Sequence, residues 1–100
     1  MIRVEIKYKE DCISSIEISG HAYQNKEGFD LVCAGVSATY SGAVYSLEGK
    51  GIKETHSKGY AKIDVVSDIS THDRYVLEVL KDQLVFLGRE EKDYIKVILN

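Results

Sequence analysis

The sequence contains no proline, and no part of it is repetitive or low in complexity. Without a proline-rich or otherwise biased segment there is no candidate linker. The chain of 100 residues is therefore expected to form a single domain over residues 1–100. Hydrophobic residues make up 44% of it, which is enough to build one core without metal or disulfide crosslinks.

The chain also lacks a cluster of basic residues. It has 13 Lys and Arg against 16 Asp and Glu, a net charge of -3, and its lysines are scattered among acids. Nucleic-acid binding usually requires a basic patch, so no direct nucleic-acid partner is expected. There is no glycine-rich phosphate loop or dinucleotide fingerprint either, which argues against a nucleotide cofactor.

Long apolar runs are missing as well. The first five residues carry charges where a signal peptide would have its apolar core. The longest uncharged run, residues 31–47, is short of a bilayer span and contains three Ser, one Thr and two Gly. No membrane association is expected. The two cysteines then point to a reducing cytoplasm and argue against a Cys12–Cys33 disulfide.

Alternating apolar and polar residues predict five strands. The predicted strands cover residues 2–8, 13–20, 52–56, 60–66 and 94–99. Short polar turns join the first strand to the second and the third to the fourth. Both pairs are therefore expected to form hairpins.

Two segments have helical patterns instead. Residues 31–48 are rich in small side chains and end at Gly49 and Gly51. The glycines inside this helix cost about 1 kcal/mol each relative to alanine, so close packing against a sheet or a partner is expected. A second helix is predicted after the capping sequence of residues 70–73, ending at Gly88. Its apolar stripe consists of Val76, Val79, Leu80, Leu84 and Leu87.

The order ββαββαβ predicts an α+β fold, with a mostly antiparallel sheet and two helices packed on one side. Reactive side chains are concentrated in residues 20–37. His21 follows the second strand, and Cys33 falls in the first turn of the first helix, which Asp30 is placed to cap. The first-turn N–H groups favour a thiolate and could bind an oxyanion.

The helix start alone does not activate Cys33. A dipole contribution of ~0.3–1 kcal/mol lowers the pKa by less than about one unit, and the charge of Asp30 acts in the opposite direction. A thiol with an ordinary pKa near ~8.5 therefore needs a partner, and His21 is the candidate. The loop between these two residues would then bring them together, which makes loop closure part of the mechanism.

Structural interpretations of the same residues remain open. Cys33 can be a small core residue, Asp30 only a helix cap, and His21 only a turn residue. Ser37, one helical turn after Cys33, can simply fill space. Gly20 and Gly28 can be ordinary turn glycines or can let the loop move over a substrate. From spacing alone, the catalytic and structural interpretations have about equal weight.

Other candidate sites are weaker. His21, Asp30 and Cys33 would make an unusual ligand set, so no metal is expected. His56 and His72 are interpreted as surface or cap residues, and Cys12 as a bystander at a turn.

The motif itself resembles a known family. Gly20-His21-Ala22, a loop containing Gly28, then Asp30-Leu31-Val32-Cys33-Ala34 and Ser37 resemble the ribosomal-processing cysteine protease family Prp. The resemblance extends over the whole chain in length and element order.

This resemblance implies a cysteine endopeptidase in which Cys33 is the nucleophile and His21 the general base and acid, with Asp30 in support. It assigns the segment from Ala22 to Phe29 to a loop that orders around the substrate. The candidate substrate-contacting residues are Gly20, Ala22, Gly28 and Phe29. Ser37 is a candidate for supporting the catalytic side chains without contacting the substrate. No cofactor is implied.

For location and oligomeric state, the resemblance implies a homodimer in the cytoplasm. Its peptide substrate would be the precursor of a bacterial large-subunit ribosomal protein (number twenty-seven), whose short N-terminal extension it removes. Two alternatives are a non-catalytic ribosome-assembly or protein-binding module, and a thiol redox sensor if Cys12 lies close to Cys33.

Overall fold

The computed structural model describes residues 1–22 and 30–100. Its elements in chain order are β1 (Ile2–Lys9), β2 (Cys12–Ser19), α1 (Leu31–Ser46), β3 (Ile52–Ser57), β4 (Tyr60–Val65), α2 (Thr71–Glu90) and β5 (Ile95–Leu99). The predicted order ββαββαβ is confirmed. The predicted substrate-loop residues Gly28 and Phe29 lie outside the described residues.

The five strands form one sheet in the order β3-β4-β2-β1-β5. Both predicted hairpins are present, and antiparallel pairing of β2 with β4 joins them. β5 returns to pair with β1 in parallel, so the sheet is mostly antiparallel with one parallel pair. The pairing of Ser19 with Tyr60 sets the end of β2 beside the β3–β4 turn.

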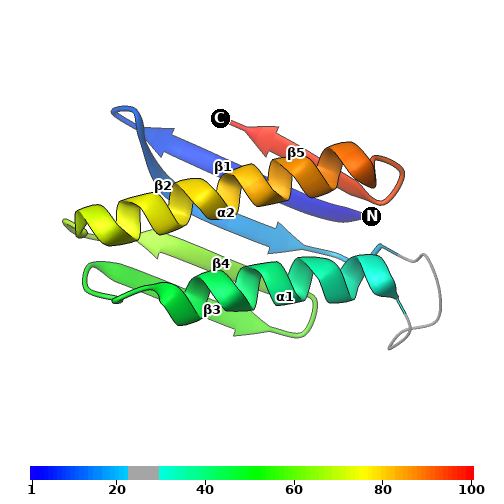
Figure 1. The fold of residues 1–100 in the computed structure, drawn as a ribbon, viewed down its shortest axis with the longest axis horizontal. Helices are drawn as coiled ribbons and strands as arrows, with labels where there is room; N and C mark the ends of the chain where they lie inside the picture. Colours follow the sequence, from blue (N-terminus) through cyan, green and yellow to red (C-terminus); the bar gives the residue numbers. More distant parts are fainter. Residues whose placement is uncertain (23–29) are drawn as a thin grey trace.

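Both helices cover the same face of this sheet and run in opposite directions (Figure 1). α1 lies over the side of the sheet formed by β3 and β4, and α2 over the side formed by β2, β1 and β5. The core between the layers consists of apolar residues from alternate strand positions and from one side of each helix, among them Val4, Ile16, Ile63, Leu80 and Val36. The predicted α+β layering is therefore confirmed.

The end of the second helix was predicted wrongly. α2 continues through Gly88 to Glu90. A Cβ on Gly88 would lie 2.7 Å from Cγ2 of Val97, so this glycine permits close packing of β5 rather than ending the helix. The predicted apolar stripe is also shifted, because Leu77 is buried while Val79 is 52% exposed.

The glycines inside α1 do not have the close packing expected of them within the chain. A Cβ at Gly35 or Gly42 would have no heavy atom within 4 Å. The sheet therefore does not require these glycines. Among the described residues, neither helix is long and apolar enough to cross a membrane.

Candidate active site

The start of α1 is fixed by Asp30. Its backbone is extended, and its carboxylate Oδ1 accepts hydrogen bonds from the N–H groups of Val32 and Cys33, each at 3.0 Å. This is the predicted N-cap, and it holds Cys33 as the third residue of the helix. Asp30 is buried, so the cap is protected from water.

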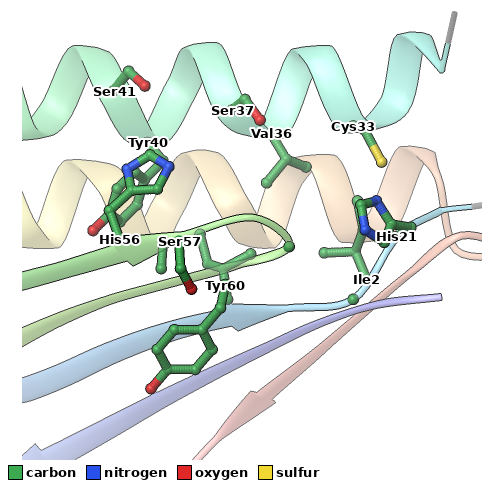
Figure 2. Close-up of a pocket in the computed structure, with 14 residues that line it drawn as sticks. Ile2, His21, Cys33, Val36, Ser37, Tyr40, Ser41, His56, Ser57 and Tyr60 are labelled. Carbon is green, nitrogen blue, oxygen red and sulfur yellow. The ribbon is translucent and has the colours of Figure 1, made fainter. Parts of the chain in front are cut away.

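The Cys33 side chain points from α1 toward the imidazole of His21 (Figure 2). Its sulfur accepts a hydrogen bond from the backbone N–H of Ala22 at 3.3 Å. Ala22 directly follows His21 and is itself buried. The segment after β2 and the first turn of α1 therefore meet at the sulfur, as the catalytic interpretation requires.

The His21 ring packs against the turn between β3 and β4. A Cβ on Gly59 would lie 3.0 Å from Nε2 of His21, so only a residue without a side chain leaves this space to the ring. The N–H of Gly20 donates to the carbonyl of Gly59 at 3.0 Å, which fixes the turn beside the histidine. Gly59 has a φ of +73°, a conformation that also favours glycine.

Cys33 and His21 share a cavity of about 150 Å³ between α1 and the strands. Its wall comprises Ile2, Ile18, Gly20, His21, Cys33, Val36, Ser37, Tyr40, Ser41, His56, Ser57, Gly59, Tyr60 and Ala61. Predicted site residues Gly20, His21, Cys33 and Ser37 are thus brought together. Asp30 and Ala22 contact the site through hydrogen bonds to the first turn and to the sulfur.

Burial raises the pKa of the Cys33 thiol. The Ala22 N–H acts in the opposite direction, and the hydrogen bond and negative charge of Asp30 raise the pKa further. The net pKa lies above the ordinary value. A raised pKa agrees with the sequence argument that the thiol needs a base to take its proton.

Three N–H groups of the first helical turn, for which an oxyanion role was predicted, already donate hydrogen bonds within the protein. The N–H groups of Val32 and Cys33 donate to the Asp30 carboxylate, and the N–H of Ala34 donates to the Asp30 carbonyl at 3.0 Å. Each of these three donors already has an acceptor. Binding an oxyanion there would require giving up the helix cap.

Sequence reasoning missed the far end of the cavity. His56 is a surface residue, as predicted, with a side chain 60% exposed. Its ring also lines the cavity, where it meets that of Tyr40 edge to face at a centroid distance of 6.0 Å. The sequence pattern that could have indicated this position is strand alternation. His56 comes two residues after Glu54 and four after Ile52, so all three lie on the helix-facing side of β3. Burial raises the pKa of Tyr40, so its hydroxyl keeps its proton.

The second thiol is remote from the first. Cys12 begins β2, whereas His21 and Ala22 follow the end of that eight-residue strand, roughly 24 Å along it. Both cysteines are free, and the Arg74 guanidinium contacts the Cys12 sulfur. Nothing in this arrangement supports a Cys12–Cys33 redox pair.

One group of metal-ligand side chains is present among the described residues, and it lies at the other end of the helix layer. Atoms of Glu48, His72 and Asp73 lie within 4.8 Å of one another. The Asp73 carboxylate there accepts the N–H groups of Glu48 and Gly49 at 2.8 and 3.0 Å. These bonds make it a structural link between the helices, and we assign no metal to it.

Comparisons with known proteins agree with this geometry. The family model for the cysteine protease Prp matches residues 1–96. A search of curated proteins finds no match. Solved structures that share the fold include two that cover nearly the whole chain. An essential ribosomal processing protease Prp from S. aureus, in complex with a covalently linked product peptide, has a TM-score of 0.91 at 24% identity and covers 100% of both chains. SMU.848 from Streptococcus mutans has a TM-score of 0.80 at 23% identity over 99% of this chain and 93% of that one.

The match covers nearly the whole chain and includes the histidine, the capped helix start and the cysteine that meet in one cavity. The chain belongs to the cysteine protease Prp family and is a cysteine protease.

Proposed function

We propose that this protease removes the short N-terminal extension from the precursor of a bacterial large-subunit ribosomal protein (number twenty-seven), with Cys33 as nucleophile and His21 as general base and acid. The observation that carries the proposal is the Cys33 side chain directed at His21 within one cavity. Family membership supports it, as does the S. aureus Prp structure with a substrate peptide (TM-score 0.85, 23% identity, 100% of both chains).

The chemistry follows from the two side chains. His21 takes the thiol proton as Sγ attacks the scissile carbonyl carbon, and the carbonyl π electrons move to oxygen. Collapse of this tetrahedral intermediate breaks the C–N bond, and the imidazolium gives its proton to the leaving amine. Water, deprotonated by His21, then hydrolyses the thioester and releases the thiolate. Asp30 supports these steps by holding the helix start that carries Cys33.

The cavity sets the form of the substrate. Tyr40 lies seven positions after Cys33, which is about 10 Å along α1. An extended peptide advances ~3.3 Å per residue, so about three residues on one side of the cut can lie along this wall. Ser37 and Ser41 offer hydroxyls for the peptide backbone, and Val36 offers apolar surface.

A peptide spanning the extension junction tests the proposal. The protein should cut it once, and Cys33→Ala and His21→Ala should each abolish cleavage. Cys12→Ala is the matched control, because it removes the remote thiol and should leave the rate within about twofold of wild type. Cleavage that persists in Cys33→Ala would show that the nucleophile is elsewhere. A junction peptide left intact by wild type, while other peptides are cut, would overturn the substrate.

The proposal includes a cytoplasmic homodimer, because the substrate is made in the cytoplasm and the outer face of the helix layer carries exposed apolar side chains. These are Leu31 (80% exposed), Tyr45 (92%), Tyr75 (65%), Val79 (52%) and Phe86 (58%). Contiguous exposed apolar surface is typical of interaction sites, so the proposed dimer would bury these side chains together. Sedimentation equilibrium should give the mass of two chains, and Phe86→Glu should shift it toward one. Wild type that sediments as a single chain at micromolar concentration would exclude the dimer.

A further inference from the structure

Attack of a thiolate on a peptide carbonyl places negative charge on the carbonyl oxygen, and a hydrogen-bond donor must meet it. In α1 the N–H groups of Val32 and Cys33 are held by the Asp30 side chain, and that of Ala34 by the Asp30 carbonyl. The donor that the structure places at the sulfur is instead the backbone N–H of Ala22, at 3.3 Å from Sγ.

A thiol sulfur is a weak acceptor, whereas an oxyanion is a strong one. An oxygen two bonds from Sγ lies within reach of a donor that already contacts Sγ. The N–H therefore gains a better acceptor as the reaction proceeds, which is the condition for stabilising the transition state more than the ground state. Ala22 is 4% exposed, so water competes little for this N–H.

The position of Ala22 is also fixed from two sides. It directly follows His21, whose ring packs on the β3–β4 turn, and the N–H of Gly20 bonds the carbonyl of Gly59 in that turn at 3.0 Å. The general base and the donor thus belong to one dipeptide that the sheet holds in place. Such preorganisation makes a backbone donor effective, since it needs no rearrangement during the reaction.

We propose that the backbone N–H of Ala22 is an oxyanion donor of this protease, an assignment that rests on the endopeptidase activity proposed above. As Sγ bonds to the scissile carbon, the N–H moves its hydrogen bond from sulfur to the new oxyanion. When the C=O re-forms and the C–N bond breaks, the bond to oxygen weakens again. Ala22 acts through its backbone, so side-chain mutagenesis does not reveal it.

A backbone ester tests the assignment, because lactic acid in place of Ala22 removes the N–H and keeps the side chain. Cys33 is a natural ligation point, so a synthetic segment of residues 1–32 can be joined to residues 33–100 to give the full chain. 3-(4-Hydroxyphenyl)lactic acid in place of Tyr8 is the matched control, since it puts an ester in the same synthetic segment and removes a backbone hydrogen bond, to the carbonyl of Asn100, that lies outside the site.

Two probes are compared on each protein. A ¹³C-labelled peptide aldehyde forms a hemithioacetal, which carries an oxygen where the oxyanion develops, and NMR reports it directly. Iodoacetamide alkylates the thiolate without forming an oxyanion. The lactate protein should bind the aldehyde about 100-fold more weakly and lose roughly 10²–10³-fold in kcat. Its limiting alkylation rate at high pH, where the rate no longer rises with pH, should stay within twofold of the unmodified protein. The Tyr8 ester control should lose at least tenfold less aldehyde affinity than the lactate protein.

Aldehyde affinity within threefold of the unmodified protein would overturn the assignment. An equal loss of aldehyde affinity and alkylation rate would also overturn it, because the N–H would then only position the thiol. An unmodified protein that forms the adduct but leaves the ribosomal junction peptide intact would contradict the proposed substrate. The Ala22 comparison would still stand, since the aldehyde arm needs no ribosomal peptide.

Discussion

The Cys33 thiol is surrounded by groups with opposing effects on its ionisation. Burial raises its pKa, the Ala22 N–H lowers it, and the Asp30 carboxylate raises it. Because the sum is a raised pKa, the thiol is protonated at neutral pH in the free protein. Asp30 thus stabilises the helix that presents Cys33 while opposing the charged form of the thiol, which leaves deprotonation to His21.

Replacing Asp30 separates these two effects. Asp30→Asn keeps a good N-cap and removes the charge, so the Cys33 pKa should fall. In a Cys12→Ala background, the midpoint of the pH profile for iodoacetamide alkylation should move to lower pH. Asp82→Asn, an exposed acid on α2, should leave the midpoint unchanged. A midpoint that rises in Asp30→Asn would show that the carboxylate does not act on the thiol as the geometry indicates.

Gly59 governs the position of the base. In Gly59→Ala the new Cβ would lie 3.0 Å from Nε2 of His21, so the ring must move. We expect kcat to fall at least tenfold with little change in KM, because small displacements of catalytic groups are costly. The His21 ring signals should shift in NMR spectra.

Gly49→Ala is the matched control for backbone strain. Gly49 also has a positive φ, +97°, but no heavy atom within 4 Å of an added Cβ. Both substitutions should cost about 1–2 kcal/mol of stability, whereas only Gly59→Ala should change kcat. Equal kinetic losses in the two variants would mean that strain, and not contact with His21, is responsible.

At the scale of the elements, two helix-interior glycines should respond to alanine with opposite sign. Gly42→Ala in α1 should stabilise the protein by about 1 kcal/mol, since helix propensity improves and the added methyl meets no atom within 4 Å. Gly88→Ala in α2 gains the same propensity, but its methyl would lie 2.7 Å from Cγ2 of Val97. Val97 is β-branched and adapts poorly, so we expect a net loss of roughly 1 kcal/mol.

Urea unfolding at pH 7 measures both changes in the free energy of unfolding. The double variant Gly88→Ala/Val97→Ala should show a favourable coupling energy relative to the two single variants, because it removes the clash. Stabilisation by Gly88→Ala equal to that of Gly42→Ala would show that β5 does not pack on this glycine as described.

The same glycine shows where sequence patterns lose information. The strands were predictable because alternation is local, and the ends of β1 and β2 differ from prediction by one residue. Gly88 was interpreted as the end of the second helix because glycine is common at helix ends. In the structure Gly88 lies inside α2, and its small size lets Val97 of β5 pack against it. Val79 was placed in the apolar stripe by spacing alone, but the position of α2 on the sheet exposes it.

For the molecule as a whole, the site was predictable only in part. Asp30 and Cys33 are three residues apart, so a capping rule relates them. Gly59 contacts His21 because β4 pairs with β2 in one register, and residues 38 positions apart in the chain meet there. Chain order does not fix that pairing. His56 reaches the cavity for the same reason, because β3 pairs with β4 and its position depends on where β4 lies in the sheet.

Asp73 connects the two helices and should therefore affect the stability of the entire domain. It is 1% exposed, lies in the first turn of α2, and accepts the N–H groups of Glu48 and Gly49 just after α1. Burial alone would raise its pKa, but these two hydrogen bonds and the His72 ring lower it more. A carboxyl whose pKa is lower in the folded state stabilises the fold above its unfolded pKa of about 3.9, and this stabilisation disappears as pH falls through the folded value.

Asp73→Ala leaves two partly buried N–H groups without their acceptor, and we expect a loss of roughly 2–4 kcal/mol in the free energy of unfolding at pH 7. Urea unfolding at pH 7 and at pH 2 should show the difference between wild type and Asp73→Ala shrinking in acid, because protonated Asp73 no longer contributes its charge. Asp82→Asn, whose side chain is 70% exposed on the same helix, should track wild type at both pH values. A difference for Asp73→Ala that stays constant from pH 7 to pH 2 would mean that the ionised carboxylate is not what joins α1 to α2.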